Sequence, residues 1–238
     1  MMEAFPLNCL SDPPSVPVSI IVPQHGRPEL TEQAVRSFLT HHHCPVELIV
    51  VEDGGVPGQL AALPALQAGQ TLRSLRLPVR QGVTAAWNAG ARTAQGEILV
   101  FLNNDTLTWG AWLEDLTAGL NCQNVASRGV AMVGVEWRPA MEVSAAVRRR
   151  LEISSLLAGW CFALRRTTWN CLGGVDEHFR LYFSDTDLQL RCLTQFPGAL
   201  QVVPGLKLRH AAHATTSGFA RRRKEWREDS QIFRRRWV

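Results

Sequence analysis

Residues 96–106, with the sequence GEILVFLNNDT, indicate the fold of this chain more clearly than any other segment. Five apolar residues run from Ile98 to Leu102 and end directly in two amides and a carboxylate. A short apolar run of this kind is typical of a strand buried in a parallel sheet. Asp105 then falls at the carboxyl end of the strand, where open α/β sheets bind their ligands. A single carboxylate among small polar groups suits a hard divalent cation that is shared with a phosphate.

Strands and helices are predicted to alternate through the first half of the chain. The periodicity predicts strands over 18–22, 46–51, 72–79 and 96–102, with helices over 29–39, 59–68 and 84–93. This alternation predicts an α/β fold whose parallel sheet has helices on both faces. Right-handed crossovers would gather the polar residues that follow the strands, at 24–26, 52–54 and 103–105, along one edge. Three carboxylates are therefore expected where a nucleotide would lie.

The pattern of the second half is different. Helices are expected over 111–120 and 187–196, strands over 130–135 and 200–203, and a loop over 207–217. Residues 156–164 are apolar, with Gly159 inside the run. Residues 141–151 are basic and poorly periodic, and the histidines at 41–43 are expected to be an exposed helix end.

Composition bounds the class of protein. The chain has 238 residues, 46% of them hydrophobic, which is enough for one sizeable domain. Prolines interrupt residues 1–16, so we expect no signal peptide and no membrane span. The six cysteines form no CxxC pair, which favours reduced thiols in a cytoplasmic protein.

The positive charge is concentrated in the C-terminal segment. Residues 221–236 carry a net charge of +5, and the remainder of the chain carries −1. The body therefore lacks the basic excess of a general nucleic-acid-binding protein, and no nucleic-acid partner is expected. A helix is predicted over 221–238, and it has two interpretations. It could contact an anionic membrane surface, at the inner face of the membrane, or it could fold back on the domain.

Seven motifs together resemble family 2 glycosyltransferases, which have the GT-A fold. They are SIIVP at 19–23, ELIVVEDG at 47–54, NAG at 88–90, GGVDEHF at 173–179, YFSDTDLQLR at 182–191, His210 and FRRRW at 233–237, besides the strand that leads to Asp105. The resemblance covers residues 18–237. It implies a Rossmann-like, mostly parallel central sheet with a small acceptor-side subregion. The implied division is an N-terminal extension (1–17), a catalytic domain (18–220) and a basic C-terminal helix (221–238), with nucleotide-binding and acceptor-binding halves of the domain meeting near residue 110.

The same resemblance implies an activity. It is the inverting transfer of a sugar from a nucleoside-diphosphate donor, of UDP or dTDP type, to a hydroxyl of a glycan or lipid-linked acceptor. The reaction would depend on Mn²⁺ or Mg²⁺ and would serve surface polysaccharide or glycoconjugate synthesis.

On the donor side, Asp53 matches the carboxylate that binds the nucleobase in the family. A carboxylate there can accept a ring N–H, or it can simply cap the turn that follows the strand. The resemblance places further donor contacts at Pro23, His25, Arg80, Asn88, Asn104 and Asp105. The segment Gln24-His25-Gly26 stands where the family usually has Thr-Tyr-Asn, so a histidine replaces the aromatic ring. Arg80 could pair with the diphosphate or be an ordinary surface arginine.

The family's metal-binding motif is reduced here to Asn103-Asn104-Asp105, with one acid. Asp105 could still complete an octahedral shell with diphosphate oxygens and water, or it could cap the helix that starts near Gly110. His210 matches a family ligand, although His213 is close enough to take that place and either could be merely solvated. An imidazole ligand suits Mn²⁺ better than Mg²⁺.

On the acceptor side, Asp185 matches the family's catalytic base, and Ser184 replaces the glutamate that usually precedes it. The base must reach the acceptor hydroxyl. Asp187 and Ser184 are candidate acceptor contacts, although both aspartates could instead serve the N-terminal dipole of the helix that follows. Trp160 could stack on a sugar or be part of the core.

Two other classes compete with this assignment. A non-catalytic nucleotide-sugar or glycan-binding module is favoured by the thinned acidic motif and by Ser184. A dinucleotide enzyme would need GxGxxG after the first strand, and residues 23–27 (PQHGR) do not supply it.

Overall fold

The computed structural model describes residues 18–54, 65–121, 129–137, 143–211 and 222–238. Within these residues, seven strands form one sheet in the order β3-β2-β1-β4-β7-β6-β8. The strands are β1 (Val18–Gln24), β2 (Val46–Asp53), β3 (Gln70–Leu77), β4 (Ile98–Leu102), β6 (Met132–Trp137), β7 (Leu156–Arg165) and β8 (Leu200–Val202). The first four run parallel, and β7 is antiparallel to both β4 and β6. The predicted α/β fold with a mostly parallel sheet is confirmed.

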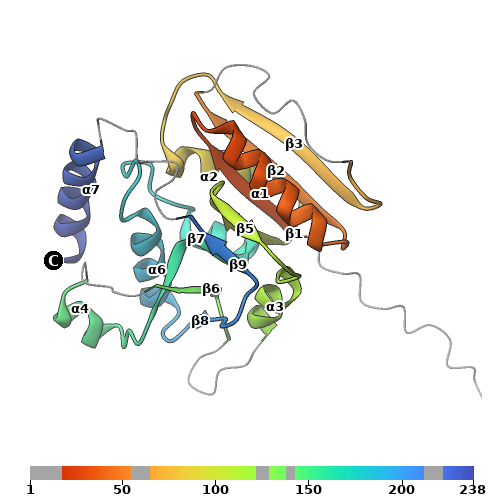
Figure 1. The fold of residues 1–238 in the computed structure, drawn as a ribbon. Helices are drawn as coiled ribbons and strands as arrows, with labels where there is room; N and C mark the ends of the chain where they lie inside the picture. Colours follow the sequence, from red (N-terminus) through yellow and green to blue (C-terminus); the bar gives the residue numbers. More distant parts are fainter. Residues whose placement is uncertain (1–17, 55–64, 122–128, 138–142, 212–221) are drawn as a thin grey trace, which may run out of the picture.

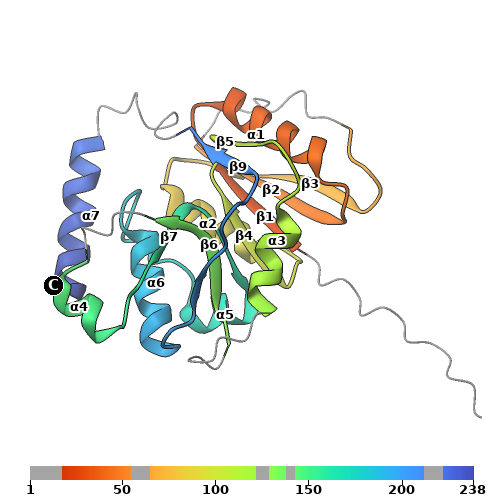
Figure 2. The same cartoon turned by 60° about the horizontal axis from the view of Figure 1, so that its bottom comes forward.

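Helices cover both faces of this sheet (Figures 1 and 2). The apolar side chains of α1 (Pro28–His41) and α3 (Leu113–Ala118) belong to one core, and those of α2 (Val83–Thr93), α5 (Arg166–Leu172) and α6 (Ser184–Gln195) belong to the other. All five residues of β4 are buried, as its apolar run predicts. Because β4 lies between β1 and β7, its carboxyl end is held at the middle of the sheet edge.

A second, two-stranded sheet crosses that edge. It pairs β5 (Thr106–Thr108) with β9 (Leu208–His210) in antiparallel fashion, and Thr106 lies opposite His210. The prediction of a loop over 207–217 is therefore wrong for residues 208–210, which form the strand β9. The pairing carries His210 next to the end of β4, about a hundred residues earlier in the chain.

Other expectations also need correction. The strand β1 extends beyond its predicted end at residue 22, through Pro23 to Gln24. Of the helix expected over 59–68, residues 59–64 lie outside the described residues and 65–68 are not helical. A short helix, α4 (Ala145–Arg150), lies in the poorly periodic segment, because Ser144 caps it by accepting a hydrogen bond from the Val147 amide.

The middle histidine of the 41–43 run is buried, contrary to expectation. His42 is 1% exposed, its Nδ1 lies 3.0 Å from the Phe38 carbonyl, and its Nε2 accepts the Trp112 amide at 3.0 Å. Burial lowers the pKa of His42, so the ring is held neutral. It therefore supplies an acceptor at the start of α3, where the N-cap residue Trp112 makes no side-chain capping hydrogen bond to a described residue.

The C-terminal helix α7 (Arg222–Trp237) folds back on the domain (Figure 1). Phe233 is 1% exposed and stacks on Phe183 at a centroid distance of 5.2 Å. The fold-back interpretation of this helix is thus confirmed. None of the helices in the described part of the chain is both long and apolar enough to span a bilayer.

Candidate active site

A cleft of about 1380 Å³ opens at the carboxyl ends of β1, β2 and β4. It is lined by residues from both halves of the chain and from α7. The predicted site residues among them are Pro23, His25, Asp53, Arg80, Asn104, Asp105, Trp160, Ser184, Asp185 and His210. The volume exceeds that of a typical small-molecule site, so it can hold a nucleotide sugar and part of a second substrate.

Asp53 fixes the turn that precedes α2. Its two carboxylate oxygens accept the backbone N–H groups of Gln81 at 2.6 Å and Gly82 at 2.8 Å. His25 lies against the same residue, with Nδ1 2.6 Å from the Asp53 carbonyl oxygen. An ionised carboxylate can accept about four hydrogen bonds, so Asp53 keeps capacity for a ligand N–H.

Two further donor-side predictions lie in the cleft with protein partners. Arg80 forms an ion pair with Glu225 of α7 at 2.7 Å. The Asn104 amide donates to the Thr31 hydroxyl at 3.0 Å, which ties the end of β4 to α1. Both side chains therefore also have a structural role.

Two buried polar groups in the cleft wall have no hydrogen-bond partner within the described residues. They are the Gln24 amide, on a side chain 1% exposed, and the Trp87 indole N–H, on a side chain 3% exposed. Leaving such a group unsatisfied costs about 1–3 kcal/mol. A polar ligand or water in the cleft would remove that cost, so this wall is suited to a ligand with donors and acceptors.

Asp105 and His210 meet at the centre of the cleft. Asp105 Oδ1 lies 2.8 Å from His210 Nε2, and the carboxylate side chain is 3% exposed. The His210 ring stacks on Trp160 at 5.3 Å with planes 2° apart, which fixes its direction. Two ligands at right angles on one octahedral cation, with bonds of about 2.1 Å, are about 3 Å apart. The pair therefore fits a shared divalent cation.

The protein supplies only part of a coordination shell. The described residues contain no group of three His, Cys, Asp or Glu side chains that could hold a metal ion. His213 lies outside the described residues. With Asp105 and His210 as two protein ligands, the remaining positions would fall to phosphate oxygens and water, the arrangement that is usual for hard cations at phosphate sites.

Asp185 lies in the first turn of α6, across the cleft from the strand ends. A Cβ on Gly159 of β7 would collide with the Asp185 carboxylate, so only glycine allows this approach. Burial raises the pKa of Asp185, and hydrogen bonds from the backbone N–H groups of Thr186, Asp185 and Gly159 offset part of the rise. A carboxyl with a raised pKa is a stronger proton acceptor once ionised.

The residue before this turn is held in an unusual conformation. Phe183 has φ +63°, in the left-handed region that side chains other than glycine rarely adopt. Its ring packs between Phe233 and Trp226 of α7. Packing against α7 thus helps to maintain the backbone that presents Ser184 and Asp185 to the cleft.

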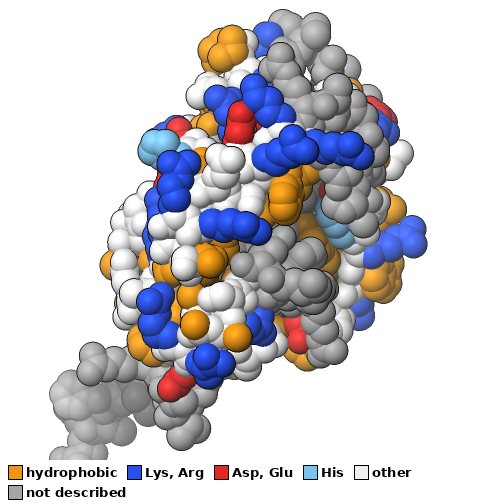
Figure 3. All heavy atoms as spheres, turned by 90° about the vertical axis from the view of Figure 1, so that its left-hand side faces the viewer, with side chains coloured by type: hydrophobic (Ala, Val, Ile, Leu, Met, Phe, Trp, Pro, Cys, Tyr) orange, Lys and Arg blue, Asp and Glu red, His pale blue; other side chains and the backbone are white. Residues whose placement is uncertain are grey.

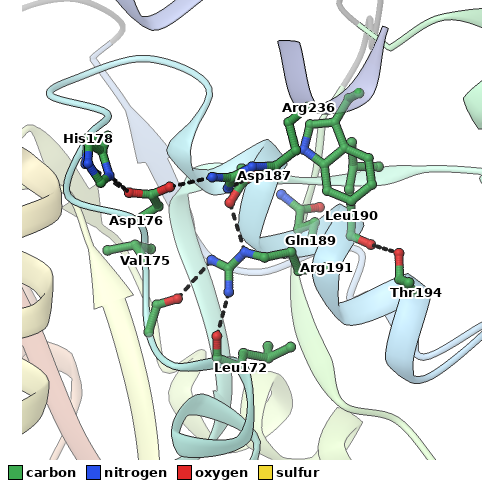
Figure 4. Close-up of polar contacts among 12 residues, drawn as sticks. Leu172, Val175, Asp176, His178, Asp187, Gln189, Leu190, Arg191, Thr194 and Arg236 are labelled. Atoms are coloured by element: carbon green, nitrogen blue, oxygen red, sulfur yellow. Dashed lines mark hydrogen bonds and ion pairs between the residues drawn. The ribbon is translucent and has the colours of Figure 1, made fainter. Parts of the chain in front are cut away.

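The assignment of Asp187 to the acceptor is wrong. Its side chain is 0% exposed, and its carboxylate binds Arg191 and Arg236, each at 2.8 Å, and the Trp237 indole N–H at 2.9 Å (Figure 4). The two residues Asp185 and Asp187 are two positions apart on α6, which turns their side chains about 200° from one another. Asp187 therefore anchors α7 and is not among the residues that line the cleft.

The assignment of Asn88 to the nucleotide is also wrong. Its side chain donates to the Val175 carbonyl at 2.9 Å and to Glu177, and it accepts the Val175 amide at 3.1 Å. Asn88 thus joins α2 to the loop before α6 and lines a separate, smaller cavity.

Several residues of the cleft wall are not among the predicted site residues. They are Gln24, Trp87, Tyr182, Arg209, Arg223, Trp226 and Arg227. The last three reach the cleft only because α7 docks beside α6. A sequence pattern predicts the helix, whereas its docking depends on long-range contacts.

Comparisons with known proteins agree with this geometry. The family profile described as Glycosyl transferase family 2 matches residues 19–184. The chain is 30% identical over 229 residues to O-antigen biosynthesis protein RfbC of Myxococcus xanthus, a match that covers 84% of this chain and 17% of RfbC. It is 27% identical over 122 residues to the uncharacterized glycosyltransferase YfnE of Bacillus subtilis, covering 50% of this chain and 30% of YfnE. The chain thus spans under a third of either relative.

The fold also resembles that of solved structures, among them a glycosyltransferase. Mannosyltransferase PcManGT from Pyrobaculum calidifontis, in complex with GDP-Man and Mn²⁺, superposes with a TM-score of 0.52 at 20% identity. The match covers 78% of this chain and 56% of that one. The predicted GT-A fold is confirmed by this likeness.

Proposed function

Because the chain belongs to glycosyl transferase family 2, we propose that it transfers a sugar from a nucleoside-diphosphate donor to an acceptor hydroxyl, with inversion at the anomeric carbon. One observation carries the proposal: Asp185 and the Asp105–His210 pair line the same cleft from opposite sides of the sheet edge. A base and a diphosphate site are what an in-line displacement needs on its two sides.

The donor would bind along the strand ends. Asp53 keeps acceptor capacity for a nucleobase N–H, and Pro23 and His25 line the same part of the cleft. Gln24 and Trp87 would satisfy their buried polar groups on the donor or on water. A UDP- or dTDP-type nucleotide is proposed, because both bases offer the ring N–H that a carboxylate accepts.

Asp105 and His210 would hold a divalent cation, Mn²⁺ or Mg²⁺, at the donor diphosphate. When bound, the cation offsets the negative charge that builds on the departing diphosphate. PcManGT, which resembles this fold, binds GDP-Man and Mn²⁺. Trp160 keeps the His210 ring in the plane that points Nε2 at Asp105.

Asp185 would act as the catalytic base. The acceptor oxygen bonds to the anomeric carbon while the bond from that carbon to the diphosphate oxygen breaks, and Asp185 takes the hydroxyl proton. Gly159 leaves room for the carboxylate, and Ser184 and Trp160 border the space beside it for the acceptor. The raised pKa of Asp185 moves the acid limb of the rate profile above the ordinary carboxyl value of about 4.

The wider setting is also a proposal. RfbC is named for O-antigen biosynthesis, which supports a role in surface polysaccharide or glycoconjugate synthesis on the cytoplasmic side of a membrane. The division into donor and acceptor halves near residue 110 would place Asp53 and Asp105 in the first half and Asp185 in the second.

The test is transfer itself. Purified protein is incubated with UDP- and dTDP-sugars and a panel of glycan acceptors, with Mn²⁺ or with EDTA, and the anomeric configuration of the product is read by NMR. We expect an inverted product that forms with Mn²⁺ and not with EDTA. A retained configuration would refute the base mechanism, and donor binding without any turnover would favour the non-catalytic module.

A further inference from the structure

The helix α7 presents to the cleft two arginines whose charges have no partner among the described residues. Arg223 and Arg227 of α7 line the cleft and are exposed. Within the described part of the chain, neither has an ion pair or a hydrogen bond, and they are one helical turn apart on the same face. Figure 3, which views the side where α7 lies, shows more Lys and Arg than Asp and Glu.

The other charged groups that α7 turns toward the domain are paired. Glu225 binds Arg80, Asp229 accepts three backbone N–H groups, and Arg236 binds Asp176 and Asp187. The contacts of Glu225, Asp229 and Arg236 thus attach α7 to the domain. Arg223 and Arg227 make no such contact with the described residues, although they line the cleft.

Trp226, which stands between the two arginines in the sequence of α7, adds an apolar ring to this part of the cleft. Trp226 is 44% exposed, lines the cleft and packs near Phe183 at 5.9 Å. A guanidinium group binds phosphate oxygens through paired N–H groups, and an indole face binds an apolar chain or ring. The three side chains together fit a ligand that joins a phosphate to an apolar group.

The position of α7 favours the acceptor over the donor as the source of that phosphate. In Figures 1 and 2, α6 lies between α7 and the β5–β9 sheet that carries His210. The proposed donor diphosphate lies at Asp105 and His210, whereas Trp226 of α7 packs near Phe183, two residues before Asp185. We propose that Arg223 and Arg227 bind a phosphate or diphosphate of the acceptor, with Trp226 against its lipid portion; this rests on the proposed function.

Binding is tested first without donor or metal. Inorganic pyrophosphate is titrated by calorimetry in EDTA into the full chain, into Arg223→Ala/Arg227→Ala, and into the charge-matched control Arg234→Ala/Arg235→Ala. The control residues are exposed on the same helix and are not among the cleft-lining residues. Because Arg223→Ala/Arg227→Ala loses two charge-assisted contacts, its affinity for pyrophosphate should be lower than that of the wild type by about tenfold or more. Equal affinity in the wild type and the cleft variant, or equal loss in both variants, would overturn the proposal.

The source of the phosphate is tested next with two probes, glucose 1-phosphate and citronellyl diphosphate. Preference for the citronellyl compound that is lost in Trp226→Ala supports a lipid-linked acceptor. Equal binding of both probes, unchanged in Trp226→Ala, supports a soluble sugar phosphate.

A kinetic measurement separates this proposal from the proposed function. Hydrolysis of the donor by water in the absence of acceptor should be unchanged in Arg223→Ala/Arg227→Ala, while the KM for a phosphate-bearing acceptor rises. A rise in donor KM instead would assign the arginines to the donor and overturn the acceptor site. Absence of donor turnover in the wild type would refute the proposed function, but it would not affect the result of the pyrophosphate titration.

Discussion

The two sides of the cleft are built by different means. On the donor side, Asp53 and Asp105 follow directly from the ends of the buried strands β2 and β4, and parallel pairing alone brings them together. On the acceptor side, Asp185 owes its place to Gly159, to a left-handed Phe183 and to a helix from the end of the chain. The comparison teaches that regular pairing sets the first wall, whereas long-range side-chain packing sets the second.

The largest expected effect is at Asp185, where one substitution should lower the rate of transfer and raise the stability of the fold. Asp185→Asn should lower transfer by a factor of about 10² or more, because no base remains to take the acceptor proton. Burial raises its folded-state pKa above the unfolded value of about 4, so folding disfavours the ionised form, and the resulting loss of stability grows as the pH rises above that value. The variant should therefore melt at a higher temperature than the wild type at neutral pH while it loses activity.

Steady-state rates and thermal unfolding of the same preparations test this pairing of effects. Asp115→Asn on the exposed face of α3 is the matched control and should change neither quantity. If Asp185→Asn is as active as the control, Asp185 is not the base.

A direct contrast of the two walls comes from Asp229 and Asp53, two buried carboxylates that bind backbone N–H groups. Asp229 accepts those of Arg180, Leu181 and Tyr182 at 3.1, 3.0 and 2.8 Å, against two for Asp53. Stranded N–H groups cost about 1–3 kcal/mol each where water cannot reach them. We expect Asp229→Ala to lower the free energy of unfolding by about 3 kcal/mol, and Asp53→Ala by about 2 kcal/mol.

Urea denaturation gives both values, and Asp229→Asn, which keeps one acceptor oxygen, should fall between the wild type and Asp229→Ala. Greater destabilisation by Asp53→Ala than by Asp229→Ala would reverse the proposed difference between the walls.

These contacts also explain what the sequence could and could not predict. The strands that end at Asp53 and Asp105 were predictable because apolar runs and strand-end polar residues are local signals. The errors at Asp187 and Asn88 have one cause: each lies within a family motif, but its partner is a distant residue, Arg236 or Val175. A motif indicates which residues gather near a site, and only packing decides which of them face it.

A smaller, pH-dependent effect is expected at His42, which follows the C-terminal end of α1 and does not line the cleft. Its folded-state pKa is lowered by burial, so the unfolded chain binds the proton more readily. Stability should therefore fall as the pH drops below about 6.5, the ordinary histidine value. His42→Gln should remove this dependence, at a cost of about 1 kcal/mol at pH 8 for the altered cap of α3.

Urea denaturation at pH 8 and at pH 5.5 measures how the free energy of unfolding depends on pH in the wild type and in His42→Gln. The exposed neighbour His43→Gln is the control and should keep the wild-type dependence. An identical pH slope in His42→Gln and the wild type would mean that His42 is protonated in the folded state.

The smallest expected effect is at Asp176, which binds Arg236 of α7 and lines the smaller cavity. Burial raises its pKa, but hydrogen bonds from the His178 amide and from Arg236 outweigh this and hold the pKa at about 2. The stabilisation is present above the unfolded value of about 4 and is lost as the pH falls toward 2. Because Arg236 is 39% exposed, solvent screening limits it to about 1 kcal/mol.

Asp176→Asn should therefore be less stable than the wild type at pH 7, and the difference should shrink between pH 4 and pH 3. Denaturation curves at these values test it. A difference that stays constant over this range would assign the effect to packing and not to charge.

The measurement that tests the shared cleft most directly is calorimetric titration of UDP, with and without Mn²⁺, into the wild type, Asp105→Asn and Asp185→Asn. If the two walls divide the work as described, Mn²⁺ strengthens UDP binding in the wild type and in Asp185→Asn, which lacks only the base, whereas Asp105→Asn loses the Mn²⁺ effect. An equal Mn²⁺ effect in Asp105→Asn and the wild type would contradict the account.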